Sequence, residues 1–211
     1  LHDIVSRTDA GSYGFIINNG WTALPEAWDA NTGASMNHCM LGHIQQWFLG
    51  SLAGIRPEPL APGFSRFVIS PEPVGALTSA RGEYQSVRGR IASAWEIADG
   101  RFKLAVNIPA NTTAEVFIPA AAPGDVQESG GRAANAPRVK FLRIDKGKAV
   151  FDTLAVDPAA ECSQLPPHDP MQVLGPALDP PAELVDFGDR VAAEPRVVYV
   201  HQVERALRGV L

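Results

Sequence analysis

The chain has 211 residues, of which 45% are hydrophobic and 19% are charged, and its formal net charge is −5 at pH 7. A chain of this length and composition can bury a sizeable core and is expected to form one or two domains. The acidic balance argues against nucleic acid as a partner, because phosphate binding needs clustered Lys and Arg. No apolar run approaches the roughly 18 residues that a membrane span requires.

The first predicted element is the end of a helix at Leu1–Arg7. Because the chain starts inside this element and not at a methionine, we expect its native start to lie upstream. The segment Thr8–Gly14 is rich in turn-forming residues, and the tripeptide Asn18-Asn19-Gly20 is a strong turn signal.

A single carboxylate follows this turn, between two tryptophans. Pro25 removes a backbone donor and favours an extended conformation at the residue before it. Glu26 is therefore expected on an irregular segment, with Trp21 and Trp28 on either side of it in the sequence. Taken alone, an isolated Glu in a loop is more often a solvated surface charge than a catalytic group.

One long helix is predicted next, from about Met36 to Leu52, with Ser35 as its N-cap. Gly54 is expected to cap its C-terminal end. His38 lies in the first predicted turn, where the ordinary interpretation is a half-buried histidine with its hydrogen bonds satisfied. Apolar residues that recur at three- and four-residue steps form the predicted core face: Met36, Met40, Ile44, Trp47 and Phe48.

The two cysteines, Cys39 and Cys162, are far apart and lack metal-ligand spacing. Cys39 lies on the predicted helix and is expected to be a small core residue. A disulfide with Cys162 is an alternative without support from the pattern. The five histidines and two cysteines form no metal-ligand constellation, and neither a metal nor another cofactor is predicted.

From Phe64 onward the period of the apolar residues changes to two, which predicts strands. The dipeptide Asp99-Gly100 is typical of a two-residue hairpin turn. Strands that recur about every 8–12 residues, as here, predict an antiparallel β-sandwich. The predicted strands cover residues 66–70, 76–86, 89–97, 102–108, 114–118, 138–144 and 149–154.

The composition shifts after Val156. The segment Asp157–Glu183 contains seven prolines and is expected to be an extended linker or wrapping segment. At the end of the chain, apolar residues at helical spacing between Val197 and Leu211 predict a helix. A strand at Arg196–Val200 followed by a short helix fits the same residues.

Short motifs occur in a fixed order between about Leu1 and Pro119: Ser12-Tyr13-Gly14, Gly20-Trp21-Thr22-Ala23-Leu24-Pro25-Glu26-Ala27-Trp28-Asp29, Met36-Asn37-His38, Pro62-Gly63-Phe64 and Ile69-Ser70-Pro71. Together they resemble the C-terminal part of bacterial α-L-rhamnosidases, glycoside hydrolase family 78. The resemblance implies an α+β chain in which residues 1–60 are the tail of an (α/α)6, or six-hairpin, catalytic barrel. Residues 61–156 would be the β-sandwich, and residues 157–211 an unassigned Pro-rich extension.

The resemblance also implies a reaction, which is the inverting hydrolysis of terminal α-L-rhamnosides. It assigns Glu26 as the general base and His38 as a sugar contact, with Trp21 and Trp28 beside the base as substrate-binding residues. Pro25 stands where the family usually has Trp, and the loop from Glu26 to the next helix is shorter than in many relatives. The family's general acid lies upstream of the matched motifs, so we expect this chain to be inactive by itself.

Two other functions fit the same sequence. One is a non-catalytic carbohydrate-binding or accessory β-sandwich, and the other is a truncated structural remnant without a function of its own. The implied partner in the main hypothesis is a rhamnose-containing glycoside or oligosaccharide, with no nucleic acid and no membrane involved. Neither the compartment nor the oligomeric state is indicated by any motif.

Overall fold

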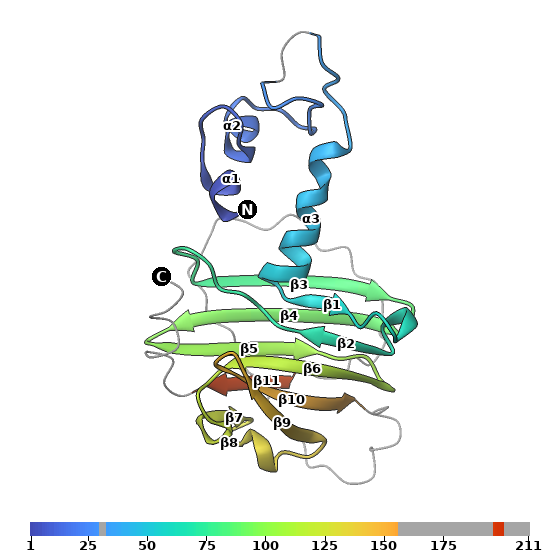
Figure 1. Ribbon diagram of the computed structural model, residues 1–211, viewed down its shortest axis with the longest axis vertical. Coiled ribbons are helices and arrows are strands. Elements are labelled where there is room, and N and C mark those ends of the chain that lie inside the picture. Colours follow the sequence, from blue (N-terminus) through green and yellow to red (C-terminus); the bar gives the residue numbers. More distant parts are fainter. Residues whose placement is uncertain (30–32, 156–195, 201–211) are drawn as a thin grey trace, which may run out of the picture.

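A computed structural model describes residues 1–29, 33–155 and 196–200. Two β-sheets make up one end of the molecule, and an N-terminal helical part stands on them at the other end (Figure 1). The helix labelled α3 leads from this part into the first strands. Within the described ranges, none of the helices is long and apolar enough to cross a membrane.

The N-terminal part contains three helical segments. Helix α1 covers His2–Ser6, and α2 covers Tyr13–Asn18. The third is continuous and changes its winding along its length: the 3-10 turn η1 Met40–His43, the α-helical turn α3 Ile44–Trp47 and the π-helical turn η2 Phe48–Leu52. The sequence did not predict α2, whose N-cap Ser12 accepts a hydrogen bond from the Phe15 amide at 3.2 Å.

The predicted start of the long helix at Met36 was wrong, because the helix begins at Met40. The backbone of Ser35 accepts a hydrogen bond from the Glu26 amide at 2.8 Å, and the His38 amide donates to the Leu24 carbonyl at 2.8 Å. These bonds hold residues 35–38 against the preceding loop. Ser35 is therefore a partner of that loop and not a helix cap.

The prediction of a buried face on this helix was wrong for the first half of the predicted residues. Met36 and Met40 are 42% and 59% exposed, whereas Leu41 and Ile44 are buried. Cys39 is exposed and has no disulfide, so its prediction as a core residue was also wrong. All three exposed residues lie at or before the first helical turn. There the hydrogen bonds between residues 35–38 and the preceding loop direct the chain so that these residues face away from the buried side. Cys162 lies outside the described residues.

Eleven strands form two sheets in the part of the chain that the structure describes. The first sheet has the order β1-β2-β6-β10-β9, and the second has the order β3-β4-β5-β11-β7-β8. The strands are β1 Ile55–Pro57, β2 Arg66–Ile69, β3 Ser79–Ser86, β4 Gly89–Ala98, β5 Arg101–Asn107, β6 Thr112–Pro119, β7 Val126–Glu128, β8 Gly131–Arg132, β9 Val139–Asp145, β10 Lys148–Ala155 and β11 Arg196–Val200.

All seven strands predicted from the alternating pattern are confirmed, with ends that shift by at most three residues. The turn at Asp99-Gly100 is confirmed too, with positive φ values of 51° and 70° that suit a tight hairpin. The strand alternative at Arg196–Val200 is present as β11. The short strands β1, β7 and β8 were not predicted, because two or three residues are too few to show a period. The predicted linker Asp157–Glu183 and the end of the chain after Val200 lie outside the described residues.

One strand pair departs from the antiparallel prediction. β2 and β6 are parallel neighbours, with Phe67 opposite Ala114. Parallel neighbours need a long crossover connection. Here the connection is the β3-β4-β5 meander, which belongs to the other sheet and returns the chain in the same direction.

The hydrophobic core lies between the two sheets. Phe67, Ile69 and Phe151 from the first sheet and Ile91, Phe102 and Leu104 from the second all belong to one cluster of buried residues. Each of these side chains has at most 1% of its surface exposed. The inner faces of the two sheets are therefore packed against each other.

A glycine ends the helix and brings it onto the sheets. Gly54 has φ +78°, and a Cβ atom there would lie 2.2 Å from the Pro71 nitrogen. The predicted helix stop at Gly54 is thus confirmed, and the close approach adds a second reason for glycine. Beside it, the Trp95 indole donates to the Leu52 carbonyl at 2.7 Å. This bond ties the last helical turn to β4.

Candidate active-site loop

The predicted site residues lie on the loop between α2 and η1, at the end of the molecule farthest from the sheets (Figure 1). Two backbone hydrogen bonds fold this loop on itself, from the Glu26 amide to the Ser35 carbonyl and from the His38 amide to the Leu24 carbonyl, each 2.8 Å long. The segments that carry Glu26 and His38 therefore run side by side, although eleven residues separate Glu26 from His38 in the sequence.

Glu26 is exposed, and its carboxylate is held by the backbone of the same loop. The Ser35 amide donates to Glu26 Oε2 at 3.1 Å, while the Glu26 amide donates to the Ser35 carbonyl. Pro25, next to it, is buried and fixes the chain at this point. A carboxylate that is tied by one oxygen keeps its other lone pairs for further hydrogen bonds, such as one from a water molecule.

The ring of His38 is oriented by a backbone amide. Met40 N–H donates to His38 Nδ1 at 3.3 Å, so Nδ1 acts as the acceptor. In the neutral ring the hydrogen then lies on Nε2. His38 is half-buried, and its Nε2–H is a donor for an oxygen atom of a bound molecule.

Trp21 and Trp28 attach the loop to helix α2. The Trp21 ring meets Phe15 edge-to-face with 5.8 Å between centroids, and the Trp28 ring meets Tyr13 in the same way at 5.1 Å. Such edge-to-face pairs contribute about 0.5–1.5 kcal/mol beyond the area they bury. Both indoles are half-buried, so each keeps an accessible face or edge.

Tyr13 links this aromatic pair to the helix that follows the loop. Its hydroxyl donates to the Leu41 carbonyl at 2.6 Å, and burial raises the pKa of the Tyr13 hydroxyl. The group therefore stays a neutral donor at any physiological pH. The sequence contained no local signal for this contact, because Tyr13 and Leu41 are 28 residues apart.

A large recess on the described surface does not contain the predicted site residues. It is an open groove of about 410 Å³ between the helix and the sheets, lined by Trp47, Leu49, Ile55, Arg56 and Phe64, among others. Glu26 and His38 do not line it. Trp47, predicted from the sequence to be core, is half-buried at the wall of this groove and packs against Phe48 with 5.4 Å between ring centroids.

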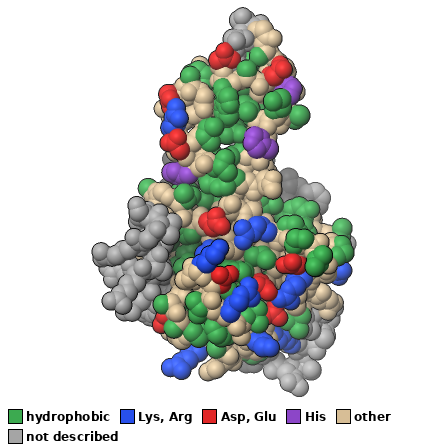
Figure 2. Space-filling view, in the orientation of Figure 1, with side chains coloured by type: hydrophobic (Ala, Val, Ile, Leu, Met, Phe, Trp, Pro, Cys, Tyr) green, Lys and Arg blue, Asp and Glu red, His purple; other side chains and the backbone are tan. Residues whose placement is uncertain are grey.

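The surface of the sheets carries both signs of charge, with Lys and Arg interspersed among Asp and Glu in Figure 2. On the outer face of the first sheet, Arg66 bonds Glu115 at 2.9 Å and lies 3.1 Å from Asp152. Arg143 bonds the second oxygen of Glu115 at 2.9 Å. Burial opposes ionisation of Glu115, but its hydrogen bonds with Arg143 and Arg66 outweigh this effect and lower its pKa. Both oxygens of the Glu115 carboxylate are therefore paired with an arginine.

Among the described residues, no group of three or more His, Cys, Asp and Glu side chains is placed to hold a metal ion. The four predicted site residues offer a carboxylate, an imidazole and two indoles.

Comparison with known proteins gives the same assignment for both parts of the chain. The model of the bacterial alpha-L-rhamnosidase 6 hairpin glycosidase domain matches residues 1–52, and the model of the bacterial alpha-L-rhamnosidase C-terminal domain matches residues 54–133. Two adjacent segments of this chain match domains of the bacterial α-L-rhamnosidases. The resemblance seen in the sequence motifs is confirmed, and with it the resemblance to a glycoside hydrolase. All four predicted site residues lie within the part matched by the six-hairpin model.

Curated α-L-rhamnosidases share a third of the matched residues with this chain. The protein of Streptomyces avermitilis is 36% identical over 150 residues, which are 67% of this chain and 14% of the relative. One from Formosa agariphila is 32% identical over 146 residues, which are 65% of this chain and 16% of the relative. The chain spans between 13% and 17% of the length of the curated α-L-rhamnosidases that it matches.

Solved α-L-rhamnosidase structures share the fold. The Streptomyces avermitilis enzyme, whose crystal structure was determined in complex with L-rhamnose, superposes with a TM-score of 0.64 at 33% identity. That match covers 72% of this chain and 15% of the enzyme. The enzyme from Dictyoglumus thermophilum also gives a TM-score of 0.64, at 20% identity, over 95% of this chain and 18% of that protein. At that identity the second match establishes a common fold only.

Proposed function

We propose that this chain is a segment of an α-L-rhamnosidase-like glycoside hydrolase, which in a complete enzyme hydrolyses terminal α-L-rhamnosides with inversion. Residues 1–60 are the tail of its (α/α)6 barrel, and residues 61–156 are its β-sandwich. The observation that carries the proposal is the folded loop: backbone hydrogen bonds bring Glu26 and His38 together inside the segment matched by the six-hairpin model.

In this proposal Glu26 is the general base. Inverting hydrolysis needs one carboxylate that activates a water molecule and a carboxylic acid about 6.5–9.5 Å away that protonates the leaving group. Glu26 is exposed, and among the described residues one hydrogen bond, from the Ser35 amide to Oε2 at 3.1 Å, holds its carboxylate, which can accept a proton from water. The acid has to come from sequence beyond these 211 residues.

His38, Trp21 and Trp28 are the proposed sugar contacts. Because His38 Nδ1 accepts the Met40 amide, Nε2–H is the donor that meets a sugar hydroxyl oxygen. The half-buried indoles of Trp21 and Trp28 supply flat apolar surface for the sugar ring, and their edge contacts with helix α2 hold them in place. The ligand is a rhamnose-containing glycoside or oligosaccharide.

The experiment is a chimeric enzyme. Residues 1–155 replace the matching segment of the Streptomyces avermitilis α-L-rhamnosidase, and hydrolysis of an aryl α-L-rhamnoside is measured. Glu26→Gln in the active chimera should lower kcat about 10²–10⁴-fold, because loss of a general base costs this much. Glu83→Gln, an exposed glutamate on β3, is the matched control and should leave kcat unchanged. A Glu26→Gln chimera as fast as its parent would overturn the assignment.

Three further measurements separate the roles. Proton NMR of the first product formed should show the β-anomer, as inversion requires. Ser35→Pro removes the amide that holds the Glu26 carboxylate and should lower kcat more than it raises KM, whereas Ser35→Ala keeps that amide and should behave like the parent. The isolated chain should show no turnover, and measurable hydrolysis by purified residues 1–211 would contradict the proposal that the acid lies elsewhere.

A further inference from the structure

The second sheet is continuous only through its most C-terminal strand. β11 lies between β5 and β7 and pairs with both in antiparallel orientation. Val198 is opposite Leu104 on one side and Glu128 on the other. Apart from β11, the described neighbour of β7 is the two-residue strand β8. Without β11 the sheet would separate into the β3-β4-β5 meander and the small β7-β8 pair.

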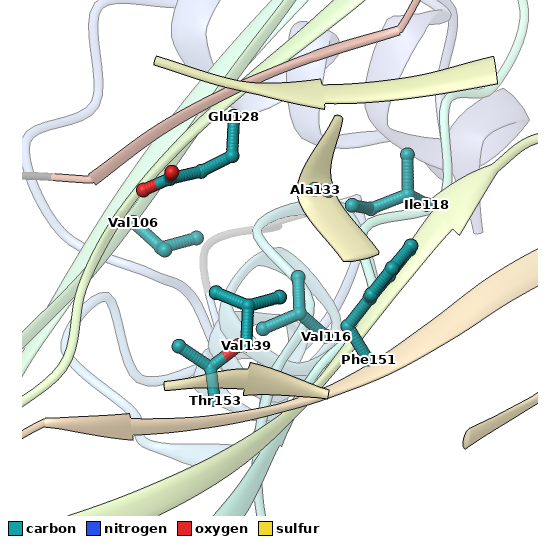
Figure 3. A pocket seen from close by; sticks show the side chains of 8 residues that line it. All are labelled: Val106, Val116, Ile118, Glu128, Ala133, Val139, Phe151 and Thr153. Atoms are coloured by element: carbon teal, nitrogen blue, oxygen red, sulfur yellow. The ribbon is translucent and has the colours of Figure 1, made fainter. Parts of the chain in front are cut away.

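The strand position between β5 and β7 is therefore a slot, defined here by the edges Lys103–Val106 and Val126–Glu128. It contains two rows of backbone donors and acceptors facing each other. Figure 3 shows the interior beneath it, where Val106 and Glu128 come from the two bordering strands and β11 passes between them. Both side chains line a small internal cavity that Val116, Ile118 and Phe151 close from the first sheet.

The strand that fills the slot comes from a distant part of the chain. β10 ends at Ala155 and β11 begins at Arg196, so forty residues, 156–195, separate them. A connection of forty residues gives its end an effective concentration on the order of millimolar at most. The entropic cost of closing a loop rises only slowly with loop length. The same strand from another molecule competes with the chain's own strand once the concentration of that molecule approaches the millimolar range.

Strand addition suits such an exchange because its affinity comes mainly from backbone hydrogen bonds on both sides of the added strand. We propose that the slot between β5 and β7 is a strand-acceptor site, and that Arg196–Val200 of a second copy occupies it in place of the chain's own β11. The product is a strand-exchanged dimer in which each sheet is completed by the other molecule. This proposal does not depend on the glycosidase function.

The register supplies a direct test. Ala105 is the register partner of Val197, and cross-strand partners have the Cα separation of about 4.5–5.5 Å that a disulfide accepts. In a Cys39→Ser, Cys162→Ser background, Ala105→Cys and Val197→Cys in one chain should form an internal disulfide. A mixture of the two single-cysteine variants, concentrated to about 1 mM and oxidised, should give a disulfide-linked dimer.

The control mixture pairs Val197→Cys with Ala94→Cys, which lies on β4, one strand away from the slot. It should stay largely uncrosslinked. An internal disulfide in the double variant together with no dimer in the Ala105→Cys and Val197→Cys mixture would overturn the exchange. Failure of the double variant to form its internal disulfide would overturn the slot itself.

A peptide experiment tests the same site without crosslinking. Val198→Pro in the full chain removes a backbone donor from a strand that is paired on both sides, so the chain's own strand should leave the slot. A fluorescent peptide of residues 193–202 should then bind this variant about tenfold tighter than the parent. Val198→Thr, which keeps the donor, should behave like the parent. Equal peptide binding by the three proteins would overturn the proposal, and hydrogen exchange of the β6–β10 pair checks that each variant is folded.

Discussion

The two parts of the molecule bury their side chains to very different extents. Among the described residues, every side chain of large volume that is buried to less than 2% exposure lies between Phe67 and Phe151, in or next to the sheets. Of the described residues in the N-terminal part, 1–29 and 33–52, only Ile16, Leu41 and Ile44 are large buried apolar residues, and Ile17 is 71% exposed. The sheets thus contain their own core, whereas the N-terminal part is organised mainly by hydrogen bonds and aromatic edge contacts.

The buried core that stabilises the chain and the residues proposed to act on the sugar therefore lie in different parts of the molecule. The residues proposed to act on the sugar lie in the part with little core, on a loop held by a few backbone bonds. Functional loops positioned by a rigid scaffold follow the same division. The sheets can keep their fold when the loop is changed, so variants of the loop can be made without unfolding the chain.

The largest expected effect comes from the sheet core. Phe102→Ala removes a fully buried ring between the sheets and should lower the free energy of unfolding by about 3–5 kcal/mol. Met40→Ala, in the exposed first turn of the helix, should change it by less than about 0.5 kcal/mol. Urea unfolding followed by circular dichroism measures both. If the two variants lost similar amounts of unfolding free energy, the two parts would not differ in their contribution to stability.

The next effect concerns the junction that joins the parts. Gly54→Ala places a Cβ 2.2 Å from the Pro71 nitrogen at a φ of +78° and should cost about 2–4 kcal/mol. Gly50→Ala is the matched control in the same helical segment, since its Cβ would meet only Arg56 Cγ, at 3.7 Å. That change should be neutral or stabilise by up to about 1 kcal/mol. If the two substitutions proved equally costly, the close approach of helix and sheet at Gly54 would not be needed for stability.

The smallest effect tests the charged face of the first sheet. Glu115→Gln removes the carboxylate shared by Arg66 and Arg143 and should cost about 1 kcal/mol at pH 7. Because the folded-state pKa of Glu115 is lowered, this stability is fully present above its unfolded value of 4.5 and is lost as the pH falls through the folded value. The thermal stabilities of the parent and the variant should therefore converge as the pH falls below 4.5 and through the folded value.

Salt gives an independent check on this network. Raising ionic strength should shrink the difference between parent and Glu115→Gln, because exposed charges are screened. Glu83→Gln, which breaks an exposed pair with Arg90, is the comparison and should cost less than about 0.5 kcal/mol. A Glu115 effect that does not shrink at all as the pH is lowered from 4.5 would contradict the assigned cause.

The sequence predicted the sheet part well and the helical part poorly, for a physical reason. Alternation along a strand is a local property, and residues such as Phe102 and Leu104 show it without knowledge of their partners. The start of the helix depended on a contact between Ser35 and Glu26, nine residues apart. The apolar spacing of Met36 and Met40 suggested a buried face, but the loop pairing decided where the helix begins.

The candidate site was only half visible in the sequence. The motif around Glu26 and the Asn37-His38 pair identified the residues, while the bonds that orient them come from Ser35 and Met40 through their backbone amides. Backbone donors have no residue signature, so no motif could have found them. The parallel pairing of β2 with β6 escaped prediction for a related reason, since strand order is set by which sheet an intervening meander joins.

Local residue chemistry was enough to reveal the resemblance to α-L-rhamnosidases, the positions of the longer strands, the turn at Asp99-Gly100 and the helix stop at Gly54. Three outcomes became clear only from the fold: which residues the helix buries, how the loop holds Glu26 and His38, and that β11 completes the second sheet from forty residues away. Those outcomes depend on contacts between distant segments, whose energies no local pattern records.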